Sequence, residues 1–94
     1  MRRLALDIGN KRIGVAVSDI TGLYAFPLTT IYRKNISNDI EKLYQLIIEK
    51  EANELIIGLP LLLSGEEGAQ VRLVKSFVNL LNKKIDIPIY YIDE

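Results

Sequence analysis

The chain has 94 residues, of which 49% are hydrophobic and 26% are charged, with 12 basic residues balanced by 12 acidic ones. This composition is typical of one small globular domain and excludes a disordered chain. The sequence contains neither cysteine nor histidine, which excludes disulfides, a thiol nucleophile, a Ser-His-Asp triad and most zinc sites. Catalysis would have to rest on carboxylates, lysines, hydroxyls or a hard metal ion.

Three β-type segments open the chain. Residues 4–8, 13–19 and 25–32 are short, apolar and separated by turn-forming residues, which predicts an antiparallel meander. Pro27 has no N–H to donate to a neighbouring strand. The third strand is therefore expected at an edge of the sheet.

Two helices then alternate with two further strands. The first helix is predicted from an apolar face with helical spacing, formed by Ile40, Leu43, Tyr44, Ile47 and Ile48. The second is predicted in the same way from Val71, Val74, Phe77, Val78 and Leu81. Ser37 or Asn38 could cap the first helix, and Ser64 with Glu67 has capping-box spacing before the second. Strands are expected at residues 54–59 and 87–92.

The predicted element order is β-β-β-α-β-α-β, which defines an α/β fold with a mixed sheet. Right-handed crossovers place the fourth and fifth strands beside the first, so the expected strand order is 3-2-1-4-5. The first strand is then central, and its carboxyl end faces the crevice where open α/β sheets bind ligands.

Targeting signals and charge give weaker information. No apolar run approaches the ~20 residues that a membrane span needs, and the start of the chain lacks the apolar region of a signal peptide, so we expect a soluble, cytoplasmic protein. Residues 1–34 hold six basic and two acidic residues, a charge of +4, and the remainder holds six and ten, a charge of −4. The basic front could attract a polyanion, or it could be ordinary surface charge.

Asp7 is the most informative residue, because it interrupts a strand expected to be buried. A buried carboxylate needs a cation, hydrogen-bond donors or access to water. Alternation places Asp7 on one face with Ala5, and the facing strand offers Gly14 and Ala16 if the register matches. Such a patch of small residues would let a bulky partner approach the carboxylate. The alternative is that the small residues admit a close-packed helix while Asp7 caps a turn.

The turn after this strand and the end of the chain supply further charged residues. Gly9 and Asn10 suit positive φ, and Lys11 and Arg12 could contact phosphates beside a metal-holding acid, or simply form a solvated turn. Glu94 ends the fifth strand, roughly 10 Å from the first. It could join Asp7 in a magnesium site, or it could be merely solvated.

These residues resemble a known family. Residues 4–19 resemble the opening motif of the YqgF/RuvX family, residues 57–61 resemble its second motif, and residues 92–94 resemble the start of its Asp-Glu-Arg motif. Gly65, Glu67, Gly68 and Gln70 resemble the entry to its second helix. The resemblance spans the chain and implies an RNase H-like fold.

The resemblance also implies an activity and its residues. It implies a metal-dependent phosphodiester nuclease that processes the precursor of 16S ribosomal RNA or, alternatively, resolves Holliday junctions. Asp7 and Glu94 would be the catalytic, metal-binding acids, with Mg²⁺ or alternatively Mn²⁺ as cofactor. The residues implied to lie along the nucleic acid are Gly9, Lys11, Arg12, Gly58, Pro60 and Gln70.

Departures from the family pattern limit these expectations. The family continues past its Asp-Glu pair with an arginine, a further helix and a third acid. We therefore expect residues 1–94 to be a single domain, truncated at its C-terminus, with one sheet face partly bare and activity reduced or lost. Leu62 and Ser64 replace residues that are usually or often polar or acidic in the family. Related resolvases also carry an acid near the end of strand four, where this chain has residues 58–60.

Two other functions are compatible with the same residues. One is a non-catalytic module that binds nucleic acid, because a third acid is lacking. The other is an actin-like ATPase or sugar kinase, whose phosphate loop also resembles residues 7–17, although those enzymes need several hundred residues. The sequence does not separate an RNA substrate from a DNA junction, because basic residues report phosphate rather than base identity.

Overall fold

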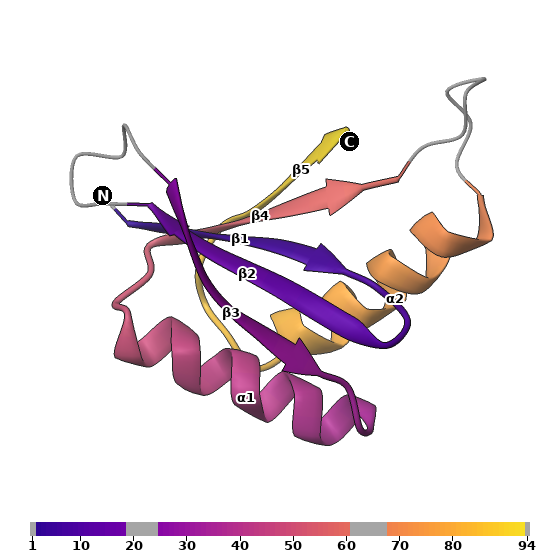
Figure 1. Ribbon diagram of the computed structural model, residues 1–94, viewed down its shortest axis with the longest axis horizontal. Coiled ribbons are helices and arrows are strands. Elements are labelled where there is room, and N and C mark those ends of the chain that lie inside the picture. Colours follow the sequence, from indigo (N-terminus) through magenta and orange to yellow (C-terminus); the bar gives the residue numbers. More distant parts are fainter. Residues whose placement is uncertain (1, 19–24, 61–67, 94) are drawn as a thin grey trace.

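The computed structural model describes residues 2–18, 25–60 and 68–93. Its elements follow the predicted order (Figure 1). They are β1 (Arg3–Ile8), β2 (Arg12–Ser18), β3 (Ala25–Tyr32), α1 (Ile36–Glu49), β4 (Glu54–Leu59), α2 (Ala69–Asn82) and β5 (Ile89–Asp93).

The strands form one five-stranded sheet in the order β3-β2-β1-β4-β5, as predicted. β1 pairs antiparallel with β2 and parallel with β4, and β5 pairs parallel with β4. β3 is an edge strand, and its pairing with β2 shifts register between Val15 and Ala16, where Ala16 faces Pro27. Pro27 therefore lies both at an edge and beside an irregularity, the two places where a sheet tolerates a missing N–H.

Both helices pack on the same face of the sheet. The buried side chains of α1 and α2 join those of the central strands in a single hydrophobic cluster. This cluster includes Leu4, Leu6 and Ile8 of β1, which share one face by alternation. On the opposite face Tyr90 and Ile92 are 51% and 53% exposed. No helix among the described residues covers that face, in line with the expectation of a partly bare sheet (Figure 1).

The start of the first helix differs from prediction. The N-cap of α1 is Asn35, whose side-chain oxygen accepts a 2.8 Å hydrogen bond from the Asn38 backbone N–H, so the predicted caps at Ser37 and Asn38 are wrong. The apolar face of α1 also differs at one position. Ile48, predicted in this face, is 54% exposed, because the buried stripe is centred on Leu43 and Ile47.

The second helix keeps its predicted face but not its predicted cap. All five predicted apolar positions of α2 are buried. Its N-cap is Gly68, which makes no side-chain cap bond, rather than Ser64. Ser64 and Glu67 themselves lie outside the described residues. Across the described segments, neither helix is long and apolar enough to cross a membrane.

A surface ion pair ties α1 to the segment that follows α2. Lys84 donates to Glu41, and together with Gln45 it holds the pKa of the Glu41 carboxyl below its ordinary value. A carboxyl whose pKa is lowered in the folded state adds stability at pH values above its ordinary pKa, and this stability is lost as pH falls through the lowered pKa.

We expect Lys84→Ala to raise the pKa of Glu41 in an NMR pH titration. An unchanged pKa of Glu41 in this variant would show that the ion pair is not formed in solution.

Candidate functional site

Asp7 lies on the uncovered face of the sheet, close to the carboxyl end of the central strand. Its neighbours Leu6 and Ile8 are 2% and 4% exposed because they face the helices, whereas Asp7 is exposed. Of the three ways to accommodate this carboxylate, the structure shows access to water. Within the described part of the chain, no hydrogen bond or ion pair engages its oxygens. Both oxygens are therefore available to a ligand.

The predicted patch of small residues surrounds this carboxylate. Asp7 pairs with Gly14 and Ala5 pairs with Ala16, which confirms the register assumed from the sequence. A Cβ added at Gly14 would lie 3.7 Å from the Asp7 Cβ, an ordinary van der Waals contact. An alanine would thus fit at this position, while longer side chains would crowd the carboxylate. Because these side chains are so short, they leave open space on the face of the sheet beside Asp7.

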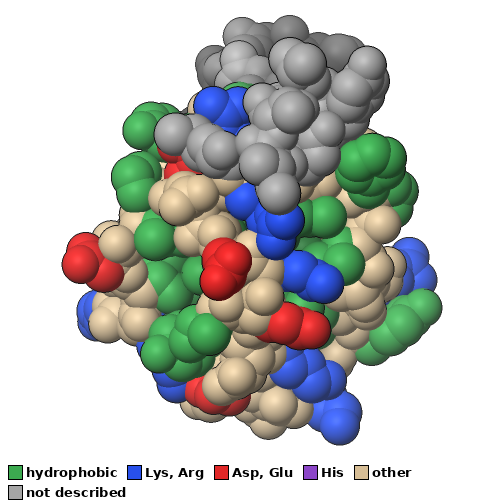
Figure 2. Space-filling view, turned by 90° about the vertical axis from the view of Figure 1, so that its left-hand side faces the viewer, with side chains coloured by type: hydrophobic (Ala, Val, Ile, Leu, Met, Phe, Trp, Pro, Cys, Tyr) green, Lys and Arg blue, Asp and Glu red, His purple; other side chains and the backbone are tan. Residues whose placement is uncertain are grey.

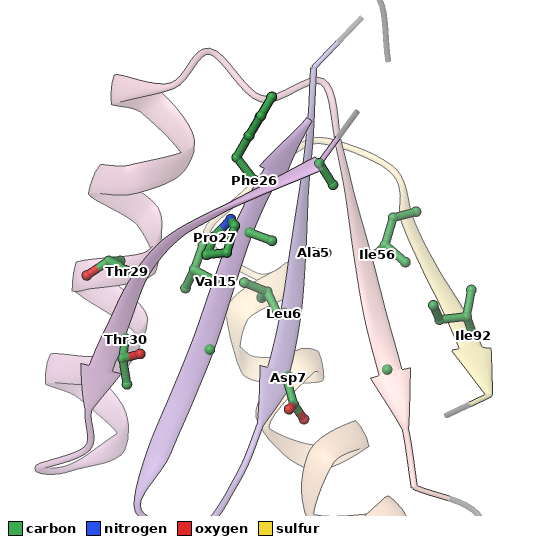
Figure 3. A pocket seen from close by; sticks show the side chains of 14 residues that line it. Ala5, Leu6, Asp7, Val15, Phe26, Pro27, Thr29, Thr30, Ile56 and Ile92 are labelled. Carbon is green, nitrogen blue, oxygen red and sulfur yellow. The ribbon is translucent and has the colours of Figure 1, made fainter. Parts of the chain in front are cut away.

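Two open depressions meet at Asp7. One, of about 480 Å³, lies on the uncovered face and is lined by residues of all five strands, among them Ala5, Gly58 and Ile92 (Figure 3). The other, of about 750 Å³, follows the β1–β2 turn. Its lining residues are Asp7, Gly9, Asn10, Lys11, Arg12, Gly14, Thr30 and Tyr32. The second depression brings the predicted acid and both predicted phosphate-binding cations to one surface.

The β1–β2 turn is held by close backbone contact. The Gly9 N–H donates to the Arg12 carbonyl oxygen at 2.8 Å. A Cβ at Gly9 would lie only 3.0 Å from that oxygen, so a side chain there would force the backbone apart. The expected positive φ is wrong for both turn residues: Glu51 is the one non-glycine residue with positive φ among those described, and Gly9 is outside the left-handed region too. The close approach of the Arg12 carbonyl oxygen therefore favours glycine at this position.

Lys11 and Arg12 are exposed, and within the described segments their side chains have no ion-pair partner. Other basic residues of the front third are engaged elsewhere. Arg3 pairs with Glu54 and Arg33 with Asp39. The charge of +4 in residues 1–34 therefore overstates the positive field, because two of its cations are paired with acids from later in the chain. The free positive charge beside Asp7 comes from the turn.

The opposite end of the sheet has a different character. It carries the Arg3–Glu54 pair, and the Arg2 guanidinium donates to the Lys50 carbonyl oxygen at 2.8 Å. The space-filling view of this side shows basic and acidic side chains interspersed rather than a surface of one sign (Figure 2). This distribution favours the β1–β2 turn over the amino end of β1 as the place where a polyanion would bind.

The remaining predicted residues are only partly brought to this site. Gly58 lines the depression on the uncovered face, and Pro60 directly follows β4. Gln70 lies in the first turn of α2, which packs on the opposite face, and it lines neither depression at Asp7. Glu94 lies outside the described residues. Ile92, two residues earlier, lines the same depression as Asp7 (Figure 3).

The residues present fit part of a magnesium site. Mg²⁺ is usually held by one or two protein carboxylates, with waters and substrate phosphates completing its octahedron. The free oxygens of Asp7 suit one such ligand. Among residues 2–18, 25–60 and 68–93 no group of three acidic or other metal-binding side chains lies together. Asp7 is the one acidic residue among the described residues that line the two depressions, and the predicted second carboxylate, Glu94, lies outside the described residues.

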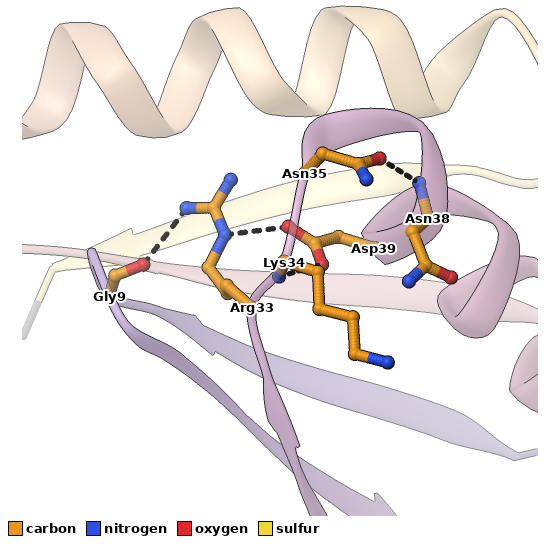
Figure 4. A network of polar contacts seen from close by, with 6 residues as sticks. All are labelled: Gly9, Arg33, Lys34, Asn35, Asn38 and Asp39. Atoms are coloured by element: carbon orange, nitrogen blue, oxygen red, sulfur yellow. Dashed lines mark hydrogen bonds and ion pairs between the residues drawn. The ribbon is translucent and has the colours of Figure 1, made fainter.

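Sequence reasoning missed a buried acid behind the turn. Asp39 in the first turn of α1 is 1% exposed and pairs with Arg33 at 3.0 Å. Arg33 also donates to the Gly9 carbonyl oxygen at 3.0 Å (Figure 4). In the sequence, Asp39 is indistinguishable from a solvated acid at a helix N-terminus. The spacing of an arginine just before the helix and an acid within its first turn is the available signal.

Comparison with known proteins identifies relatives of the whole chain. The family described as "RuvX: Holliday junction resolvase" matches residues 1–94. A protein of Roseiflexus sp. (strain RS-1) named "Putative pre-16S rRNA nuclease" is 45% identical over 93 residues, which cover 99% of this chain and 66% of that protein. The chain thus spans just under two thirds of that relative's length.

Solved structures show where the fold recurs. RuvC of Thermus thermophilus superposes with a TM-score of 0.73 at 13% identity, covering 99% of this chain and 64% of RuvC. The same protein in complex with a Holliday junction substrate superposes with a TM-score of 0.71 at 14% identity, with the same coverage. At this identity the similarity establishes the RNase H-like fold alone.

Proposed function

This chain belongs to the RuvX family, and on that basis we propose that it forms the core of a metal-dependent endonuclease that processes the precursor of 16S ribosomal RNA. The observation that carries the proposal is the placement of Asp7. Its free carboxylate shares one depression with the unpaired cations of Lys11 and Arg12. An acid able to hold a metal beside phosphate-binding cations suits metal-assisted phosphodiester hydrolysis. Such a substrate places the proposed site of action in the cytoplasm.

In this proposal the chain's residues divide the work of binding and chemistry. Lys11 and Arg12 attract phosphates, and the guanidinium of Arg12 can contact two phosphate oxygens at once. The short side chains at Gly14 and Ala16 leave room for the nucleic-acid backbone to approach Asp7. Asp7 and Glu94 would hold Mg²⁺, which supplies an activated water and neutralises charge on the leaving oxygen.

A second candidate substrate is the four-way DNA junction, which the description of the matching family favours. The discriminating experiment uses the full-length protein with Mg²⁺, a precursor 16S RNA fragment and a junction of equal phosphate number. We expect the RNA precursor to be cleaved faster, with cleavage abolished by a chelator. Faster cleavage of the junction would establish the second candidate, and binding without cleavage of either would establish a non-catalytic module.

The role of the turn predicts a change in salt dependence. The slope of log K against log salt is negative, and removing one cation that neutralises a phosphate should reduce its magnitude by roughly 0.7–0.9. We expect the Lys11→Ala/Arg12→Ala variant to bind more weakly, with the magnitude of the slope reduced by about 1.5. Fluorescence anisotropy at several salt concentrations measures both quantities. The control is Lys83→Ala, which removes a charge beyond the end of α2. Because the control removes one charge rather than two, a change in slope half as large as that of the double variant would contradict a local role for the turn.

A further inference from the structure

We infer that Arg33 is a positioning residue that fixes the backbone of the β1–β2 turn, so that Lys11 and Arg12 are held ready for phosphate. This inference deepens the proposed function and rests on it. Arg33 directly follows β3 in the short connection to α1, outside the turn that it would position. Its role follows from four contacts, two with the turn and two that hold the guanidinium itself.

The turn is bonded to Arg33 at two points. The Arg33 backbone N–H donates to the Lys11 carbonyl oxygen at 2.9 Å. Its guanidinium Nη1 donates to the Gly9 carbonyl oxygen at 3.0 Å (Figure 4). The two acceptors lie on either side of Asn10. One residue therefore restrains the turn at both ends, through one main-chain bond that any non-proline residue would keep and one side-chain bond specific to arginine.

The guanidinium is itself held by groups behind it. Nε donates at 3.0 Å to Asp39, which is 1% exposed and also accepts the Lys34 backbone N–H at 3.1 Å (Figure 4). The guanidinium carbon lies 4.9 Å from the centre of the Phe77 ring of α2. The planar guanidinium donates to Asp39 and to the Gly9 carbonyl oxygen at once from two fixed nitrogens while it stacks on the ring, and the single ammonium of lysine does not reproduce this geometry.

These contacts assign Arg33 a role behind the substrate-binding surface. Its side chain is 20% exposed, and two of its nitrogens are already committed to Asp39 and Gly9. Arg33 also lines neither depression at Asp7, whereas Lys11 and Arg12 line one of them. A residue that bound phosphate directly would present its donors to the depression. Arg33 presents them to the turn.

The first test replaces the arginine by lysine, which keeps the charge. We expect Arg33→Lys to weaken binding of the RNA precursor by roughly three- to tenfold, which lies in the lower part of the range of coupling between residues in contact. The KM should rise by this factor while kcat changes little. The matched control is Arg3→Lys, which alters an Nε-to-carboxylate pair at the far end of β1. An Arg33→Lys variant that binds like the wild type would overturn the inference, because charge alone would then suffice.

A double-mutant cycle separates positioning from direct contact. In the Lys11→Ala/Arg12→Ala background the positioned cations are gone, so we expect Arg33→Lys to weaken binding no further. Additive losses in the cycle would overturn the inference, since Arg33 would then act independently of the turn.

A variant in which both partners of the ion pair are replaced controls for misfolding. Losing one partner of the Arg33–Asp39 pair leaves a buried charge uncompensated, but replacing both by apolar residues of similar size is often tolerated. Arg33→Met/Asp39→Leu should therefore fold while releasing the Gly9 carbonyl oxygen. We expect faster amide hydrogen exchange at Gly9 in this variant, with exchange unchanged at Asn53, which bonds to Arg2 at the far end of the sheet. Unchanged exchange at Gly9 would overturn the inference.

The exchange measurement needs no substrate, so it also distinguishes two failures. If the wild-type protein neither binds nor cleaves nucleic acid, the proposed function fails. The restraint of the turn by Arg33 would then still be read from the exchange rates. If the wild type cleaves but the variants bind normally, the proposed function stands and the positioning role fails.

Discussion

Replacement of Asp7 by asparagine is expected to abolish Mg²⁺-dependent cleavage while leaving binding intact. The amide has the size of the carboxylate but no negative charge with which to hold a divalent ion. Metal-ion catalysis contributes several kcal/mol of transition-state stabilisation, so we expect the cleavage rate to fall about a thousandfold, which corresponds to roughly 4 kcal/mol. Single-turnover cleavage and anisotropy on the same RNA measure the two effects separately.

The exposure of Asp7 makes this test unusually clean. Because the carboxylate has no partner among the described residues, its replacement should change the free energy of unfolding by about 0.5 kcal/mol or less. A loss of activity cannot then be attributed to unfolding. Asp86→Asn is the matched control, since Asp86 is exposed and lies in the segment before β5. Cleavage that persists in purified Asp7→Asn protein would remove Asp7 from the catalytic site.

The second large effect concerns stability. Ile57 lies in the middle of β4 between Leu6 of β1 and Tyr91 of β5, and it is fully buried against the helices. Ile57→Ala should lower the free energy of unfolding by about 2–5 kcal/mol, because the reduced burial and the cavity add together. That is a large fraction of the ~5–15 kcal/mol that holds a domain folded. Urea denaturation followed by circular dichroism measures it.

The matched control for this prediction is Ile48→Ala in α1. It removes the same atoms from a side chain that is 54% exposed. We expect it to cost less than about 1 kcal/mol, since most of its surface is already in water. Equal losses for the two variants would show that Ile48 is buried in solution, as the helical spacing predicts.

The sequence was sufficient for the architecture because two kinds of local signal agreed along the chain. The change from strand-like to helical spacing after residue 32, and the turn residues between segments, predicted the observed element order and strand order. The register between β1 and β2 also followed, because a shift by one residue would have turned Leu4 and Leu6 away from the core. These features depend on neighbours in sequence, on alternation and on the fixed hand of the crossover connections.

Local signals did less well at the ends of helices. Several polar residues precede α1, and each can accept a bond from the first turn, so sequence alone does not choose among them. In the structure the N-cap of α1 is Asn35. At the β1–β2 turn, Gly9 was predicted to suit positive φ, and this expectation is wrong. The preference for glycine comes instead from the short distance to the Arg12 carbonyl oxygen, which depends on how the whole turn closes.

The sequence by itself determined the family, the topology and the presence of Asp7 beside two cations. The family and the charged turn are recognised from residues that lie close together in the chain. The topology follows from the order of the elements and the hand of their crossovers. Only the tertiary structure decided which cations remain free, since Arg3 and Arg33 are paired with acids contributed by β4 and α1. It also decided that Asp7 is solvated and that Asp39 is buried. Arg3 and Glu54 are 51 residues apart and meet only because β1 pairs with β4. Arg33 and Asp39 are six residues apart, but the burial of their pair depends on α2, whose Phe77 lies against the guanidinium.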